Sequence, residues 1–183
     1  MCLKIIFDCI YYGQKYEKVK ELDRFGQNIY SSVRRKEMKA TILAIGKCKR
    51  GSAEAELINE YVKRSDWDVT IKEKDNATQD EEAKFLLENI PAGAKVIVLD
   101  ERGVNIKSLE LAAKIENWML NGTSELCFLI GGADGHLQAT RDRADLLLSF
   151  GKLTLPHILM RAVLAEQIYR VQTIIKHHPY HRE

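Results

Sequence analysis

The sequence has no apolar run that approaches the roughly 18 residues of a transmembrane helix, so a membrane-spanning protein is not expected. The apolar start, residues 1–12, contains Lys4 and Asp8 and lacks a small-residue cleavage site, which argues against a signal peptide. Repeats, low-complexity tracts and Pro- or Ser-rich linkers are also missing. Since 45% of the 183 residues are apolar, we expect a cytoplasmic globular protein of one domain, or of one domain with an appendage.

The four cysteines, Cys2, Cys9, Cys48 and Cys127, form no CxxC pair. Metal-ligand spacing is therefore absent, and we expect no metal site of the zinc type. Cys127 lies within an apolar run. The pattern predicts buried or free thiols in a reducing compartment.

The chain also lacks a large excess of either positive or negative charge. Residues 1–37 have eight Lys/Arg and five Asp/Glu, a balance of +3, and residues 38–183 have twenty and twenty-one, a balance of −1. Overall charge thus gives no reason to expect a nucleic-acid partner. The exception is local, because residues 151–183 contain five basic and two acidic side chains and four of the five histidines.

What the sequence does have, from Met38 onward, is an alternation of apolar strands with helices. This alternation predicts an α/β fold whose mostly parallel sheet has helices on both faces. Thr78 or Asp80 is expected to cap the second helix and Ser108 the third, and Pro156 suits the first turn of the last one. The expected strands are 39–45, 68–71, 95–99, 125–130 and 145–150, and the expected helices are 53–62, 78–90, 108–120, 138–143 and 156–176.

Ligands of such sheets bind at the carboxyl ends of the strands, which directs attention to the loops 100–103, 131–135 and 151–157. The sequence GGADG at 131–135 allows a ligand close to the backbone but matches neither the GxGxxG fingerprint nor a phosphate loop. A tight strand-to-helix turn is the alternative. The segment 153–157 could offer backbone groups to an adenine edge, or could simply connect a strand to a helix.

The last helix and the tail behind it carry further candidate residues. Leu159, Val163, Ile168 and Val171 form an apolar stripe, which predicts either a helix packed on the sheet or a dimer interface with Arg161 and Arg170 near a shared site. Residues 177–183 contain three histidines, a tyrosine and an arginine around one proline. On composition this is a polar tail or a weak metal site, although Tyr or His can stack on a base and Arg can bind phosphate.

Taken together and in this order, these motifs resemble a known family. Leu99-Asp100 at a strand end, IGGxxG at 130–135 and TLPHxLxRxxLAEQxYRxxxIxxxHPYHRE at 154–183 are similar to the bacterial ribosomal large-subunit pseudouridine N3-methyltransferases of the SPOUT class. The resemblance covers residues 38–183.

The resemblance implies a homodimer whose subunits have a C-terminal trefoil knot that binds S-adenosylmethionine. Knots are rare exceptions to the usual topological rules, and periodicity alone would not have predicted one. Carried over to this sequence, the implied cofactor contacts are Leu99, Gly131, Phe150, Gly151, Lys152, Leu153, Thr154 and Leu155.

The implied substrate is a pseudouridine of 23S rRNA in the assembled ribosome, whose N3 is methylated. The family's short form has no separate RNA-binding domain, which agrees with the near-neutral charge of residues 38–183. Candidates near the target base are His157, Tyr180, His181 and Arg182, with the tail of one subunit completing the site of the other. His181 is the most natural proton acceptor, because imidazole titrates near neutrality. Arg182 would bind phosphate or the base edge, and His157 could instead orient the last helix.

Two alternatives remain at this stage. One is a related enzyme that acts on a different RNA, and the other is a ribosome-associated factor without catalytic activity. Residues 1–37 match nothing in the family, so we expect them to lie outside the methyltransferase domain, 38–183. We favour Met38 as the natural start, and a genuine extension that adds RNA or subunit contacts is the rival interpretation.

Overall fold

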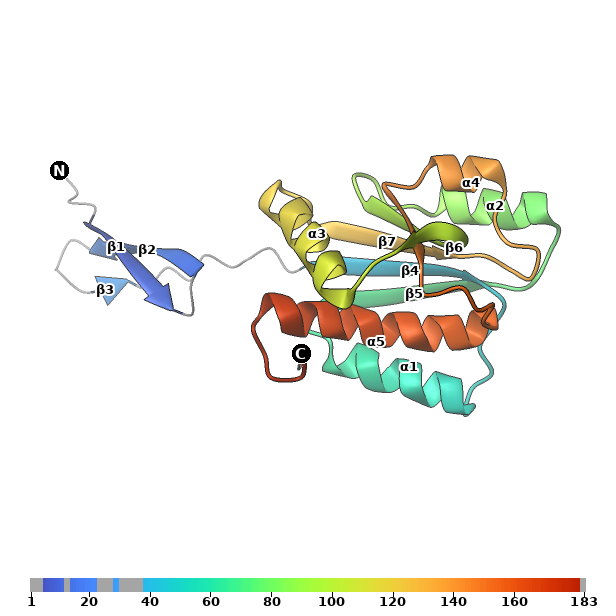
Figure 1. Cartoon of the computed structure of the whole chain (residues 1–183), viewed down its shortest axis with the longest axis horizontal. Coiled ribbons are helices and arrows are strands. Elements are labelled where there is room, and N and C mark those ends of the chain that lie inside the picture. The colour runs from blue at the N-terminus through green and yellow to red at the C-terminus, as the bar shows by residue number, and fades with distance from the viewer. Residues whose placement is uncertain (1–4, 12–13, 23–27, 30–37, 182–183) are drawn as a thin grey trace. The chain divides into compact units, whose positions relative to one another are not determined.

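The computed structural model describes residues 5–11, 14–22, 28–29 and 38–181, in two units, Met1–Lys36 and Glu37–Glu183 (Figure 1). In the first unit three antiparallel strands pair in the order β1-β2-β3. These strands are β1 (Ile5–Tyr11), β2 (Gln14–Leu22) and β3 (Asn28–Ile29). The second unit contains every motif discussed above except those of the N-terminal segment.

The second unit is built on a five-stranded sheet in the order β5-β4-β7-β6-β8. All of its pairings are parallel, which confirms the predicted fold class. Its strands are β4 (Lys39–Ile45), β5 (Asp68–Lys74), β6 (Lys95–Asn105), β7 (Glu125–Ile130) and β8 (Leu146–Ser149). Because the strands are parallel, their carboxyl ends lie at one edge of the sheet.

Helices cover both faces of this sheet (Figure 1). On one face, α3 and α5 pack against alternate strand residues such as Ile42 and Phe128, and α1 packs against α5. On the other face, Leu86 of α2 meets Leu43 and Leu129, and α4 contacts α2. The helices are α1 (Ala53–Arg64), α2 (Gln79–Glu88), α3 (Ser108–Leu120), α4 (Gln138–Asp142) and α5 (His157–Ile175).

Two helix starts test the predicted caps. Thr78 caps α2 as expected, and its hydroxyl accepts from the backbone N–H of Glu81 in a capping box. The predicted cap at Ser108 is wrong, because Lys107 holds the cap position and its backbone N–H donates to the Glu110 carboxylate at 2.7 Å. The Ser108 hydroxyl is free to donate to Gln167 of α5 at 2.8 Å instead.

Strand β6 also differs from expectation, since residues 100–103 were predicted to be a loop. The strand continues through them to Asn105, with a shift of register against β8 between Leu99 and Val104. A Cβ on Gly103 would lie 2.5 Å from the carbonyl carbon of Leu148, so only glycine permits this close pairing. The sequence of Asp100, Glu101 and Arg102 resembles that of a loop because these polar residues lie in the irregular part of the strand.

Among the described residues, no helix is long and apolar enough to span a membrane. The trefoil knot implied by the resemblance stays a prediction. The parallel sheet and the position of the segment between β8 and α5 agree with it.

Candidate functional site

A cavity of about 560 Å³ opens at the carboxyl ends of the central strands. Its walls come from three segments: the end of the regular part of β6, the turn after β7, and the connection from β8 to α5. The structure therefore brings together the three segments that follow predicted strands, although the first of them, residues 100–103, is strand and not loop. The volume is within the range of pockets that enclose small organic ligands.

The turn after β7 leaves almost no space for side chains. A Cβ on Gly131 would lie 3.2 Å from the His136 ring, and one on Gly132 would lie 2.6 Å from the Glu82 carboxylate of α2. Gly135 donates its N–H to the carbonyl of Gly132 at 3.2 Å and has a φ of +71°, which favours glycine. The glycines thus put main chain, not side chains, at this wall of the pocket.

His136 is a pocket residue that the sequence interpretation missed. It is buried, and its Nε2 lies 3.1 Å from the carbonyl oxygen of Leu99. Burial lowers the pKa of His136, so the ring is neutral, and since a carbonyl only accepts, Nε2 carries the hydrogen. Its place directly after the glycine turn was the one signal that could have revealed it.

Asp100 is the second missed residue, and it pairs with Arg141 of α4. Arg141 Nε donates to Asp100 Oδ2 at 2.7 Å, and the backbone N–H of Arg102 donates to Oδ1 at 2.9 Å. Burial by itself would raise the pKa of Asp100, but these two donors outweigh it, and the pKa lies below its ordinary value. Asp100 is therefore ionised at neutral pH.

The connection from β8 to α5 forms the third wall, with Gly151 at a φ of +136°. The Ser149 hydroxyl donates to the Gly151 carbonyl at 2.7 Å and fixes the start of the connection. Within the described part of the chain, the backbone N–H groups of 152–155 donate to no protein acceptor. They are available to a ligand, as backbone groups outside a helix or sheet must find other partners when covered.

His157 and Arg161 begin α5 at the rim of this pocket. His157 lines the cavity, and a Cβ on Gly46 would lie 2.3 Å from its Nε2, so the ring packs against the glycine backbone. Arg161 is fully buried, pairs with Glu73 and donates to the carbonyl of Gly46 at 2.8 Å. Arg161 is enclosed within its own chain and offers no surface to a second subunit, which fits the alternative of a helix packed on the sheet.

The predicted apolar stripe of α5 is only partly correct. Ile168 and Val171 are buried as expected, but Leu159 is 39% exposed and Val163 is half-buried. Leu164 packs with Ile168 and Val171 in the core cluster that contains the sheet residues, and Ala162 and Ala165 are buried as well.

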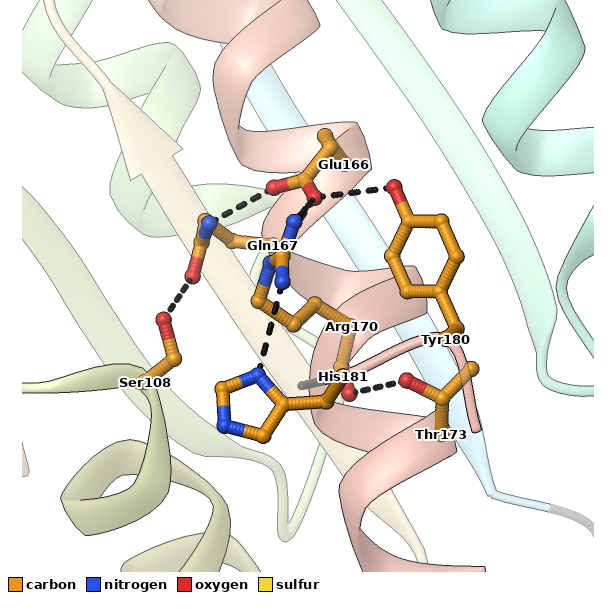
Figure 2. Close-up of polar contacts among 7 residues, drawn as sticks. All are labelled: Ser108, Glu166, Gln167, Arg170, Thr173, Tyr180 and His181. Carbon is orange, nitrogen blue, oxygen red and sulfur yellow. Dashed lines mark hydrogen bonds and ion pairs between the residues drawn. The ribbon is translucent and has the colours of Figure 1, made fainter. Parts of the chain in front are cut away.

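The C-terminal tail folds back on α5 (Figure 2). Arg170 binds the Glu166 carboxylate through Nε at 2.9 Å and through Nη2 at 2.5 Å, and Tyr180 donates its hydroxyl to the same carboxylate at 3.1 Å. Arg170 also lies over the Tyr180 ring, 5.0 Å from its centroid. Glu166 and Arg170 therefore fix the tail to the helix.

The proton positions in this cluster follow from its contacts. Burial, together with Tyr61 and Glu166 nearby, raises the pKa of Tyr180, so its hydroxyl stays protonated and donates. His181 Nδ1 lies 3.4 Å from Arg170 Nη1 (Figure 2). Because a guanidinium only donates, Nδ1 accepts and Nε2 carries the hydrogen.

Within one chain the tail and the pocket are apart. His157 lies at the start of α5 and Glu166 nine residues on, a separation of roughly 14 Å at the rise of an α-helix. The structure thus brings His157 to the pocket but Tyr180 and His181 to the other end of the helix. Arg182 lies outside the described residues. No group of three or more His, Cys, Asp or Glu side chains suited to a metal ion occurs among the residues described.

Comparison with known proteins agrees with this geometry. Residues 38–181 match the family described as "Predicted SPOUT methyltransferase". The chain is 45% identical over 152 residues to the ribosomal RNA large subunit methyltransferase H of Paramagnetospirillum magneticum, which covers 79% of this chain and 99% of that protein. The protein of the same name from Zymomonas mobilis is 42% identical over 146 residues, with 80% and 99% covered. The chain belongs to the SPOUT methyltransferase family, which confirms the resemblance and the prediction of a methyltransferase.

Proposed function

We propose that this methyltransferase takes the methyl group of S-adenosylmethionine and transfers it to N3 of a pseudouridine in 23S rRNA, on the assembled ribosome. The observation that carries the proposal is the meeting of Leu99, Gly131 and the segment 150–155 around one pocket. Seven of the eight residues that the family resemblance implies as cofactor contacts line this pocket, and the eighth, Lys152, lies between two of them in the chain.

The pocket fits S-adenosylmethionine in three respects. The free backbone groups of residues 152–155 match the hydrogen-bonding edge of an adenine. The bare backbone at Gly131 admits a ligand to close range. The apolar side chains of Leu99 and Leu155 line the same cavity and can pack on the faces of a ring. The remaining proposed contacts are Phe150, Gly151, Lys152, Leu153 and Thr154.

The names of the relatives support the choice of substrate. Both are large-subunit ribosomal RNA methyltransferases, and the chain spans 99% of the length of each. Residues 38–183 have a net charge of −1, from twenty basic and twenty-one acidic side chains. Without a broad basic face the enzyme gains little from phosphate contacts alone, so the shape of the ribosome must position it. A ribosomal substrate supports a cytoplasmic location for the enzyme.

S-adenosylmethionine supplies an electrophilic methyl group, and the protein must then align N3 with it and accept the N3 proton. Tyr180 is protonated and is therefore a poor proton acceptor, so it would orient the base. His181 would accept the proton, but in the single chain its Nδ1 faces Arg170 and its Nε2 carries a hydrogen. It can serve as a base only after its contact with Arg170 is broken. Arg182 would contact phosphate, and His157 at the pocket rim would orient the target base.

The separation of tail and pocket supports a homodimer. A site that needs both cannot form within one chain if the tail stays on its own α5. A second copy can bring its tail to the pocket, so we propose that each active site uses the pocket of one subunit and the tail of the other. Two-fold dimers are the commonest assembly of soluble homo-oligomers and would make both sites equivalent.

The test is to map methylated pseudouridine in ribosomes from a deletion strain, with and without the gene restored. Restoration of a methyl group at N3 of a 23S rRNA pseudouridine is the expected result, with calorimetric binding of S-adenosylmethionine to the purified protein. A mass shift that maps to transfer RNA would select a related enzyme with another substrate. Absence of cofactor binding would favour a ribosome-associated factor without catalytic activity.

A further inference from the structure

Two contacts hold the turn after β7 and helix α4 against the end of the regular part of β6. Arg141 of α4 donates to Asp100 at 2.7 Å, and His136 donates to the carbonyl of Leu99 at 3.1 Å. Each connects the segment that follows β7 to the end of the regular part of β6. The sheet itself pairs Leu99 with Ile130, so these two contacts act on the residues beyond Gly131, several of which line the pocket.

The ion pair between Asp100 and Arg141 is held rigidly by its burial and its hydrogen bonds. The side chain of Asp100 is 3% exposed and that of Arg141 is 14% exposed, so salt and water screen the pair little. Both carboxylate oxygens of Asp100 are engaged, one by Arg141 and the other by the backbone N–H of Arg102. A carboxylate held at both oxygens cannot rotate, and its partner is fixed with it.

Helix α4 depends on such contacts for its position. It has only five residues, Gln138–Asp142, and a helix this short is not stable by itself. From the other side, Gln79 of α2 donates to the carbonyl of Asp134 at 2.8 Å and holds the glycine turn. Arg141 is the side chain of α4 that binds it to β6, the neighbour of β7 in the sheet.

We propose that Arg141, acting through Asp100, is a positioning residue that holds α4 and the glycine turn against the end of β6, and thereby sets the affinity for the cofactor. The inference rests on the proposed binding of S-adenosylmethionine. Loss of the pair leaves α4 and the glycine turn free to move away from β6, so the ligand must restore the closed arrangement when it binds.

The test compares this ion pair with a second one on the same strand. Lys95 pairs with Asp145 at 2.7 Å, and Asp145 also accepts from the backbone N–H of Val96, but this pair lies at the opposite end of β6 and lines no part of the pocket. R141M and K95M each remove the cation. Calorimetric titration with S-adenosylmethionine and urea unfolding are measured for both, with R141K and D100N as milder variants.

R141M should bind the cofactor roughly tenfold more weakly, the size typical of a lost supporting contact. R141K should recover part of the loss, and K95M should bind as the wild type does. The double variant R141M/D100N should bind no more weakly than R141M, since the two residues act as one unit.

Wild-type affinity in R141M and D100N would overturn the inference and leave the proposed function intact. An equal loss of affinity in K95M would overturn it too, because the effect would then be general loosening of the fold. If R141M fails to fold, D100N and R141K decide the comparison. Failure of the wild type itself to bind would instead refute the proposed cofactor, and the inference with it.

Discussion

Arg161 is the largest side chain that the described part of the chain buries completely. Its guanidinium pairs with Glu73 and donates to the carbonyls of Ile45 and Gly46, and so attaches the start of α5 to the ends of β4 and β5. Burial lowers the pKa of Arg161 and Glu73 opposes this, so the pair is both desolvated and charged. Removal of the guanidinium would leave the half-buried Glu73 carboxylate and the carbonyls of Ile45 and Gly46 without their donor.

Arg161→Met should therefore lower the free energy of unfolding by about 3–5 kcal/mol, the usual cost of breaking a buried ion pair from one side. Urea denaturation monitored by circular dichroism measures it. Lys176→Met is the matched control, because Lys176 pairs with Asp66 at the surface, at 2.6 Å. It should cost less than about 1 kcal/mol. Similar costs for the two variants would contradict the structural role assigned to Arg161.

Asp100 makes stability depend on pH in a defined direction. Its pKa is lowered in the folded protein, so the stability it contributes is fully present above the unfolded value of about 3.9 and is lost as pH falls through the folded value. Asp100→Asn should be less stable than the wild type at neutral pH, and the difference should shrink below about pH 4. Urea midpoints across this range measure it, and a difference that stays constant with pH would exclude an ionised Asp100.

His181 can be tested as the proton acceptor independently of the tail as a whole. His181→Ala should lower the methylation rate on ribosomes and change the shape of its pH–rate profile, because the ionising group that sets one limb has been removed. Cofactor affinity should stay the same, since His181 is distant from the pocket in its own chain. An unchanged profile would remove His181 as the base and leave His157 as the next candidate.

At the scale of elements, the sequence predicts buried apolar strands better than strand segments that depend on pairing with a distant strand. The apolar runs 39–45 and 125–130 correspond to β4 and β7 residue for residue, because full burial leaves an unambiguous pattern. The second half of β6 was missed, since its polar residues look like a loop and only the pairing partner, β8, keeps them in a strand. The cap at Lys107 was missed for a similar reason, because the hydrogen bond that marks it is accepted by the Glu110 side chain, three residues later.

Helix α2 offers a test of its N-terminal cap, which the sequence predicts at Thr78 or Asp80. Thr78 accepts from the backbone of Glu81, and Glu81 accepts in return from the backbone of Thr78 at 3.1 Å. Thr78→Ala should destabilise the protein by about 1 kcal/mol, while Thr78→Ser should stay near the wild type, because serine keeps the hydroxyl. Thermal unfolding measures both. Since the first turn of α2 also holds the glycine turn through Gln79, the alanine variant should bind the cofactor more weakly as well.

At the scale of the whole molecule, parallel strand order explains why the pocket could be predicted. Three loops distant in sequence meet because parallel strands end at one edge. The same reasoning could not find Arg141, His136 or Glu166. Their roles depend on which side chains meet across the fold, and periodicity does not encode this. The position of the tail was also beyond the sequence, since residues after a helix can turn toward either end of it.

Mixed dimers decide whether pocket and tail act across subunits. Deletion of residues 180–183 should abolish methylation and leave cofactor affinity nearly intact. Thr154→Trp is the complementary variant, because Thr154 is an exposed residue of the pocket and a large ring there should block the cofactor without disturbing the core. Each variant alone should be inactive.

Co-expression of the two variants under different affinity tags should restore activity to the purified mixed dimer. Its tail-less subunit keeps an open pocket, and the blocked subunit supplies the tail, so one of the two sites is complete. If the tail served its own subunit, the same dimer would contain a pocket without a tail and a tail without a pocket, and would stay inactive. Because both arrangements use identical polypeptides, the recovered rate, about half that of the wild type for one site of two in a two-fold dimer, separates them independently of stability.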